Sequence, residues 1–520
     1  MCLANPLKSI IIFLFVIFTL SNFSVLGQMK IQKYRFKVDL TEVKDDQLMV
    51  ELRVPRLKQS TIVYYIPKTV PGIYGKLDFG QYISGFQALT AGGKRLKVER
   101  IEKNGWKIYN AQRLFRITYK VDDGFESHSD LGKRYNSAGS NFTQNEVFVI
   151  NHNCLFGYFK GMTKLPIELT FNKPKGFYGA TSMNATQRAE NQDVFLMRDY
   201  RSLVDAPLMY SRPDTTTMKV ANAKIMVAVH SKTGKKYAKG IAEHLKSLLE
   251  AQKNYLGGDL PVDHYTFIIS HGLGKANSIV ADALEHSYSS LYLFAATNDE
   301  LDPIASLVRK IASHEFFHII TPLNIHSEEI ENYDFNHPKM SQHLWLYEGM
   351  TEYATMHMPI KQKIQGISEF FRVVRQKIVD SRRFNNHLSF TQMSKNILQQ
   401  SNQYYNVYLK GALIGMCLDI RLRELSKGKY GTQNLMQDLA KKYGKHTPFK
   451  DKELIAEITK MTYPEIRHFF TDYVMNAKAL PIKEYLFKVG IEYDPKDDHF
   501  RPVKNITPQQ KQLRKAWIGL

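Results

Sequence analysis

The chain has 520 residues, of which 43% are hydrophobic and 12% aromatic, and its formal net charge is +21. This composition is ordinary for a globular protein of two or three domains, and it excludes a fibrous or low-complexity chain. The excess Lys and Arg residues are scattered, without the basic run or aromatic-interleaved stripe of a nucleic-acid binder. We expect a solvated basic surface that favours anionic partners or acidic substrates, and no nucleic-acid partner.

Residues 1–27 have the pattern of a secretory signal peptide. Lys8 precedes an apolar run over residues 9–20, and small residues suited to cleavage follow before Gly27. A run of about a dozen apolar residues is short for a membrane span, although an uncleaved anchor remains the alternative. We expect a secreted or periplasmic protein that begins near Gln28 and has no stable membrane insertion after cleavage.

Residues 28–210 are predicted to form an antiparallel β-sandwich. Apolar side chains recur at every second position between turn-forming residues, which is typical of half-buried strands. The segments with this pattern are 34–40, 48–54, 61–66, 115–121, 146–150 and 165–171. Among the turns, Pro71-Gly72-Ile73-Tyr74 is expected to be structural, with a place on the rim of a substrate cleft as the alternative.

The pattern changes after a polar, turn-rich passage at 211–217. A strand at 223–229, an amphipathic helix at 237–255 and another strand at 265–270 predict a sheet combined with helices. Helical patterns then continue to about residue 480, with few strand signals. The fold class is therefore predicted to be α+β and multidomain: a β-sandwich, then a domain of mixed sheet plus helices with a helical C-terminal half.

The cysteines give no strong constraint. Removal of the signal peptide leaves Cys154 and Cys417, and the sequence does not establish whether they pair. Cys417 lies in an apolar run that is typical of a core helix. We therefore expect both cysteines to be small buried apolar residues.

His314-Glu315-Phe316-Phe317-His318 is the strongest chemical motif. Residues four apart on an α-helix lie on one face, so both imidazoles can bind the same metal ion. Zinc suits imidazole nitrogen, and a catalytic zinc takes three protein ligands and leaves one position for water. Glu315 would act on that water as general base. The motif also arises by chance, but polar residues within an apolar helix need a reason.

The third ligand must come from another segment. Glu348 is the candidate, because it opens a second helix-like run. Glu352, one turn later, is expected either to orient a zinc-bound histidine or to lie exposed on the helix. The predicted cofactor is one Zn²⁺ per chain, held by His314, His318 and Glu348.

This motif, with Tyr333-Asp334-Phe335-Asn336 and the segment Leu344–Tyr353, resembles the glycyl aminopeptidase family of the gluzincin (thermolysin-like) zinc metallopeptidases. The resemblance covers about residues 30–490. It implies a thermolysin-like catalytic domain with a sheet and zinc-helix part at 211–335 and a helical part at 336–495. Many members continue into a PDZ domain, but residues 496–520 are too few for one, so we expect a C-terminal tail instead.

The same resemblance gives two further residues a role. Glu285 would bind the free amine of the substrate, and Tyr408 would stabilise the oxyanion. Asp282 and Ala283 replace glycines that are usual in the family. Glu285 as a surface carboxylate and Tyr408 as a tyrosine without a catalytic role remain the alternatives.

The predicted function is that of a secreted zinc aminopeptidase acting on peptide substrates, with Glu315 as general base. A zinc endopeptidase of the same fold is one alternative, because it needs no anchor for a free amine. A binding protein that retains the fold without turnover is the other. The sequence makes no prediction about the oligomeric state.

Overall fold

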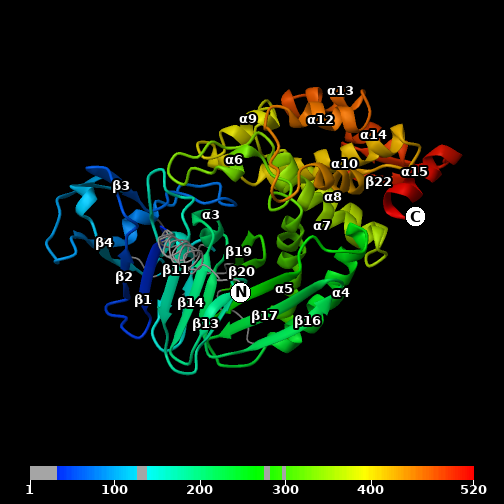
Figure 1. Cartoon of the computed structure of the whole chain (residues 1–520). Helices are drawn as coiled ribbons and strands as arrows, with labels where there is room; N and C mark the ends of the chain where they lie inside the picture. The colour runs from blue at the N-terminus through cyan, green and yellow to red at the C-terminus, as the bar shows by residue number, and fades with distance from the viewer. Residues whose placement is uncertain (1–31, 126–136, 274–280, 295–299) are drawn as a thin grey trace, which may run out of the picture.

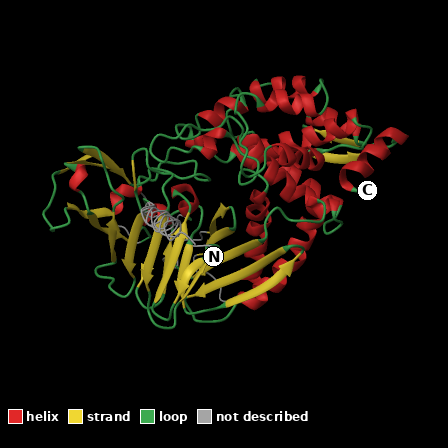
Figure 2. Ribbon diagram, in the orientation of Figure 1, coloured by secondary structure: helices red, strands yellow, loops and turns green. Residues whose placement is uncertain are grey.

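The computed structural model describes residues 32–125, 137–273, 281–294 and 300–520 (Figure 1). The predicted signal peptide at residues 1–27 lies outside these residues. Strands and helices gather in different parts of the molecule (Figure 2), and Figure 1 shows that the strands come mostly from the N-terminal half and the helices from the C-terminal half. The predicted α+β class and this order along the chain are confirmed.

The N-terminal part consists of one large sheet faced by two smaller ones. The large sheet has the order β13-β14-β11-β1-β2-β7-β4. Its strands are β1 (Tyr34–Asp39), β2 (Gln47–Arg53), β4 (Ile83–Leu89), β7 (Arg116–Asp122), β11 (Ile167–Asn172), β13 (Ala185–Arg188) and β14 (Gln192–Met197). β1 pairs with β11 in parallel, so the predicted antiparallel sandwich has a parallel pair at its centre. Alternation of side chains does not encode strand direction, and this pairing was therefore missed.

The smaller sheets close the sandwich. One has the order β10-β3-β6-β5 and the other β12-β15-β9-β8. Their strands are β3 (Thr61–Tyr65), β5 (Val98–Glu102), β6 (Gly105–Tyr109), β8 (Asn141–Thr143), β9 (Val147–Ile150), β10 (Tyr158–Phe159), β12 (Tyr178–Thr181) and β15 (Leu208–Ser211). A continuous aromatic-rich core fills the space between the sheets.

The next part is a five-stranded mixed sheet with the order β16-β17-β18-β20-β19. Its elements are β16 (Thr215–Val220), β17 (Ala223–Ser231), α4 (Ala238–Leu256), β18 (His264–His271), β19 (Ala281–His286), β20 (Ser289–Phe294) and α5 (Leu301–Glu315). α4 and α5 share a core with this sheet. A second, smaller core joins β18 and β20 to β9, β12 and β15, so the two parts of the chain are packed together.

The C-terminal half is an assembly of helices around α10 (Asn406–Leu425). The others are α6 (Glu328–Glu331), α7 (Met350–Lys361), α8 (Ile367–Ser381), α9 (Phe390–Lys395), α11 (Thr432–Lys442), α12 (Leu454–Met461), α13 (Ile466–Phe470) and α14 (Ile482–Lys488). A π-helical turn, η4 (Trp345–Gly349), lies directly against α10. A Cβ atom on Gly349 would stand 2.7 Å from the Cα of Gly411, so this approach requires glycine at the contact.

Residues 496–520 do not form a separate tail. They contribute to the hairpin β21 (Ile491–Asp494) and β22 (His499–Pro502), and then form α15 (Pro508–Ile518). Trp517 is fully buried, and its indole N–H donates to the Tyr353 hydroxyl at 2.9 Å. The segment was set apart because it is too short for a core of its own, but it adds to an existing one.

Cys154 and Cys417 are both buried, as expected, and the structure shows that they do not pair. Burial raises the pKa of Cys154 to about 12, so this thiol stays protonated at neutral pH. Within the residues that the structure describes, no helix has the length and apolar character needed to cross a membrane.

His357 of α7 makes the stability of the fold depend on pH. Its Nε2–H donates to the Trp517 carbonyl and its Nδ1 accepts from the Tyr255 hydroxyl, both at 2.8 Å, which is the bonding of a neutral imidazole. Burial lowers the pKa of His357 to about 4. The unfolded chain binds this proton near pH 6.5, so stability falls as the pH drops from about 6.5 towards 4, by roughly 3 kcal/mol for this group.

We therefore expect the melting temperature to fall between pH 7 and pH 4.5, and to fall less steeply in His357→Gln. The control is His387→Gln, which changes an exposed histidine and should keep the slope of the wild type. Equal slopes in the His357→Gln variant and the wild type would contradict this role.

Candidate metal centre

The residues of the His314–His318 motif lie where helix α5 ends and a 3-10 turn begins. His314 and Glu315 end α5, whereas His318 lies on the following 3-10 turn, η3 (Phe316–Ile319). The predicted single α-helix is therefore interrupted between the two histidines. Their rings still face the same side, with centroids 4.8 Å apart.

Glu348 reaches the two histidines from η4. It is only 2% exposed, and its Oε2 lies 3.4 Å from His314 Nε2 and 3.6 Å from His318 Nε2. The possible ligand atoms of the three residues lie within 4.8 Å of one another. The structure thus brings together the two imidazoles and the carboxylate that the sequence placed in separate segments.

The hydrogen bonds of the imidazoles fit a cation between these groups. His314 Nδ1 lies 2.8 Å from Glu352 Oε2, and His318 Nδ1 lies 2.8 Å from the Thr321 carbonyl oxygen. Both partners are acceptors, so each Nδ1 carries a hydrogen and each Nε2 faces the Glu348 carboxylate. Without a cation, burial would lower the pKa of His314, but Glu348 and Glu352 raise it well above its usual value. With a cation bound, the rings would be neutral and Nε2 would offer its lone pair. A bound cation would satisfy all three facing atoms at once, and two imidazoles with one carboxylate are a zinc donor set.

Glu352 orients His314 and is not free on the helix surface. Its second oxygen binds the ammonium of Lys377, which lies on α8. Burial alone would raise the pKa of Glu352, but the hydrogen bond from His314 and the charge of Lys377 hold it well below its usual range. Lys377 was missed in the sequence, because a lysine on an amphipathic helix gives no signal of such a contact.

Two further carboxylates adjoin the cluster. Ligand atoms of Glu285, Glu315 and His318 also lie within 4.8 Å of one another. Burial, opposed by the charge of His314 and assisted by the charges of Glu285 and Glu348, raises the pKa of Glu315 to about 8. Glu285 is half-buried on β19, the edge strand of the mixed sheet, and faces this cluster. Asp282, on the same strand, accepts the Ser137 backbone N–H at 2.8 Å.

Three tyrosines surround the same group of residues. The Tyr408 ring centroid lies 5.6 Å from that of His314, and the Tyr408 and Tyr404 hydroxyls are hydrogen-bonded at 2.9 Å. The third is Tyr74, whose hydroxyl donates to Glu348 Oε1 at 2.7 Å. Burial, together with the charge of Glu348, raises the pKa of Tyr408 and of Tyr74, so both stay neutral donors.

The sequence predicted neither Tyr74 nor Tyr404 as part of this cluster. Tyr74 was expected to belong to a structural turn, and it lies 274 residues before the carboxylate that it contacts. Only the alternative interpretation, in which this turn lies on the rim of a substrate cleft, is close to what the structure shows. No periodicity or spacing links residues so far apart, so no signal in the chain pointed to this contact.

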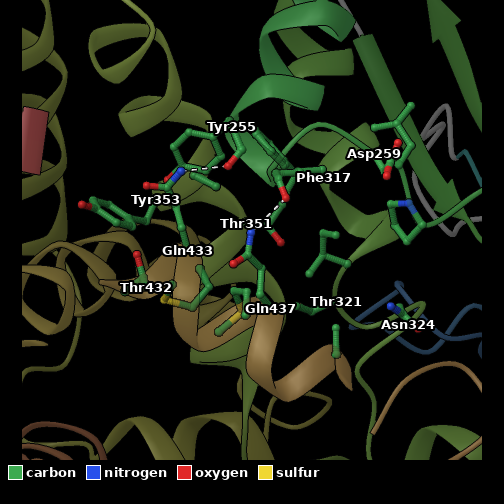
Figure 3. A pocket seen from close by; sticks show the side chains of 18 of the residues that line it. Tyr255, Asp259, Phe317, Thr321, Asn324, Thr351, Tyr353, Thr432, Gln433 and Gln437 are labelled. Carbon is green, nitrogen blue, oxygen red and sulfur yellow. Dashed lines mark hydrogen bonds between the residues drawn. The ribbon is translucent and has the colours of Figure 1, made fainter. Parts of the chain in front are cut away.

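A cavity of about 420 Å³ is lined by residues next in the chain to the metal-ligand segments, among them Phe317, Thr321 and Thr351 (Figure 3). Its lining is mainly apolar and comes from α4, η3, α7 and α11, with Phe317 and Tyr353 among the residues. None of His314, His318, Glu348, Glu315 and Glu285 lines it. Thr321 does, and the same residue holds His318 through its carbonyl.

Known proteins share this architecture. An aminopeptidase N family protein from Idiomarina loihiensis matches with a TM-score of 0.74 and 22% identity, over 92% of this chain and 82% of that one. An M1 zinc metallopeptidase from Deinococcus radiodurans, as a mutant bound to a Tyr-Ser-Ala substrate, matches with a TM-score of 0.53 and 13% identity, over 87% of this chain and 95% of that one. At these identities the likeness shows the fold.

Comparison with curated protein sequences gave no match. Family comparison, in contrast, identifies two regions of the chain. The Peptidase M61 N-terminal domain matches residues 35–212, and the M61 glycyl aminopeptidase domain matches residues 308–414. Together they cover more than half of the sequence, including His314, His318, Glu348 and Tyr408. The chain therefore belongs to the M61 glycyl aminopeptidase family and is a peptidase.

Proposed function

We propose that the protein is a zinc-dependent aminopeptidase that hydrolyses the first residue from peptides. The observation that carries the proposal is the convergence of His314, His318 and Glu348, with the carboxylates of Glu315 and Glu285 beside them. The Deinococcus protein of similar fold is a zinc metallopeptidase with a bound tripeptide, which supports zinc and a short peptide here. We also propose secretion, from the signal-like residues 1–27.

The three ligand residues would hold zinc through the imidazole Nε2 atoms and the Glu348 carboxylate. When bound there, zinc supplies the Lewis acidity that polarises the scissile carbonyl and makes water more acidic. Glu352 and the Thr321 carbonyl keep both Nδ1 atoms protonated, so the Nε2 lone pairs stay directed at the centre.

Glu315 moves the proton. Its carboxylate takes a proton from the attacking water and passes it to the nitrogen of the leaving amine. Burial increases its affinity for the proton, and the positive charge of a bound cation would lower that affinity again, so the carboxylate could both accept and release the proton. The Tyr408 phenol, which burial keeps neutral, would donate to the oxygen that becomes negative.

Glu285 would select the chain end. A carboxylate fixed beside the general base pairs with the ammonium of the first residue, whereas a peptide that continues past this point has no charge to offer. β19 lies at the edge of the mixed sheet, where an extended substrate would align beside it, although its Ala283 carbonyl already accepts the Ser137 hydroxyl at 3.1 Å. Binding energy at the amine then places the first peptide bond next to Glu315.

The first prediction of the proposed function concerns Glu315→Gln. This variant keeps the size of the side chain and leaves the ligands His314, His318 and Glu348 intact, but it cannot accept the proton. We expect unchanged zinc content and a loss of kcat by about 10³-fold or more on an aminoacyl substrate. Glu492→Gln, an exposed position on β21, is the control and should keep full activity. Substantial turnover by the Glu315→Gln variant would remove Glu315 from the mechanism.

The second prediction concerns the metal. Dialysis against a strong chelator should abolish peptidase activity, and one equivalent of Zn²⁺ per chain should restore it, because the donor set offers one site. His318→Ala should prevent this recovery and reduce the bound zinc found by elemental analysis. Full activity in verified metal-free protein would contradict the proposal and favour another mechanism of hydrolysis.

The third prediction separates exopeptidase from endopeptidase action. We expect a free peptide to be cleaved after its first residue, and its N-acetylated form to be resistant, because acetylation removes the charge that Glu285 binds. Glu285→Gln should raise KM for the free peptide by about tenfold, as expected for loss of a charge-assisted hydrogen bond. Equal cleavage of the two peptides would instead show an endopeptidase.

A further inference from the structure

The turn Val70–Tyr74 extends from the N-terminal sandwich to the metal centre. Tyr74 is 8% exposed, and its hydroxyl donates to Glu348 Oε1 at 2.7 Å. The ring lies beside that of Tyr404, with centroids 5.9 Å apart. A residue of the first domain therefore contacts a candidate metal ligand of the second.

The turn is held firmly on the catalytic side. The backbone N–H groups of Lys68 and Thr69 both donate to the Phe335 carbonyl, at 2.9 and 3.2 Å. Thr69 Oγ1 in turn donates to the Ile73 carbonyl at 3.3 Å. Phe335 belongs to the Tyr333–Asn336 motif of the sequence, so that motif anchors the turn that carries Tyr74.

The hydrogen bond from Tyr74 gives the two oxygens of the Glu348 carboxylate different partners. Oε1 accepts the Tyr74 hydroxyl, whereas Oε2 faces the imidazoles of His314 and His318. Without the tyrosine hydroxyl, a buried carboxylate can rotate and exchange its two oxygens, and one oxygen loses its donor. At metal sites, residues that do not bind the metal themselves hydrogen-bond to the ligands and fix their orientation.

We propose that Tyr74 is a positioning residue of the metal centre, which holds Glu348 so that Oε2 is presented to the cation, and that the N-terminal sandwich is thereby part of the centre. This inference rests on the proposed zinc function. It adds that metal affinity depends on a residue about 240 positions before the first histidine ligand.

The same turn also packs closely against the side chain of Glu285, the carboxylate next to Glu348. A Cβ atom on Gly72 would lie 2.8 Å from Glu285 Oε1 and 2.8 Å from a methyl carbon of Leu284, and Gly72 has a φ of +84°. Only glycine fits both the conformation and the space. The turn is thus in contact with Glu348 through Tyr74 and with Glu285 through Gly72.

The test is the zinc affinity of Tyr74→Phe in the full chain, measured by competition with a chromophoric chelator. Loss of a partner of this kind typically costs tenfold or more in metal affinity, and we expect about tenfold weaker binding here. The visible absorption of the Co²⁺-loaded protein should also change, because it reports the arrangement of the ligands. The melting temperature of the metal-free protein should change much less.

Tyr158→Phe is the matched control. Its hydroxyl accepts from the Asn336 side chain at 3.0 Å across the same interface, but Tyr158 does not contact the ligands. This variant should bind zinc as the wild type does and show the wild-type Co²⁺ spectrum.

Wild-type zinc affinity and spectrum in Tyr74→Phe would overturn the inference, and so would equal weakening in both variants, which would indicate a loosened interface. A wild-type protein that binds no zinc would overturn the proposed function and this inference together. The two failures are therefore distinguishable.

Discussion

A charged carboxylate is costly to bury, and Glu348 is one that the fold buries almost completely. Burial alone would raise the pKa of Glu348, but His318, His314 and the Tyr74 hydroxyl together lower it. These partners come from different segments of the chain, and none of them compensates the charge by itself. The surrounding helices and strands are arranged so that together they supply the contacts that make this burial possible.

Each part of the structure contributes a contact with Glu348 or with the residues around it. α5 and η3 bring the two histidines to one side, and the close approach of Gly349 to Gly411 brings η4 against α10. α10 then places Tyr408 beside His314. α8 contributes Lys377, whose charge stabilises Glu352 behind His314. The sandwich supplies Tyr74, so the β-rich part of the chain is more than a support for the peptidase part.

The features that the sequence predicted are those with local signals. Period-two segments identified strands such as β1 and β2, and the four-residue spacing identified His314 and His318 as a pair. Long-range contacts had no such signal: Tyr74 and Lys377 belong to the cluster only because the fold brings them there. The parallel pairing of β1 with β11 and the packing of Trp517 depend in the same way on tertiary contacts. The family resemblance rested on residues at the centre, where local motifs are strongest.

Crystals of the purified protein, measured above and below the zinc absorption edge, would test the central claim most directly. We expect one anomalous difference peak that contacts His314 Nε2, His318 Nε2 and Glu348, with Tyr74 hydrogen-bonded to the same carboxylate. A peak bounded instead by Glu285, Glu315 and His318, or no zinc peak in protein that is active, would contradict it.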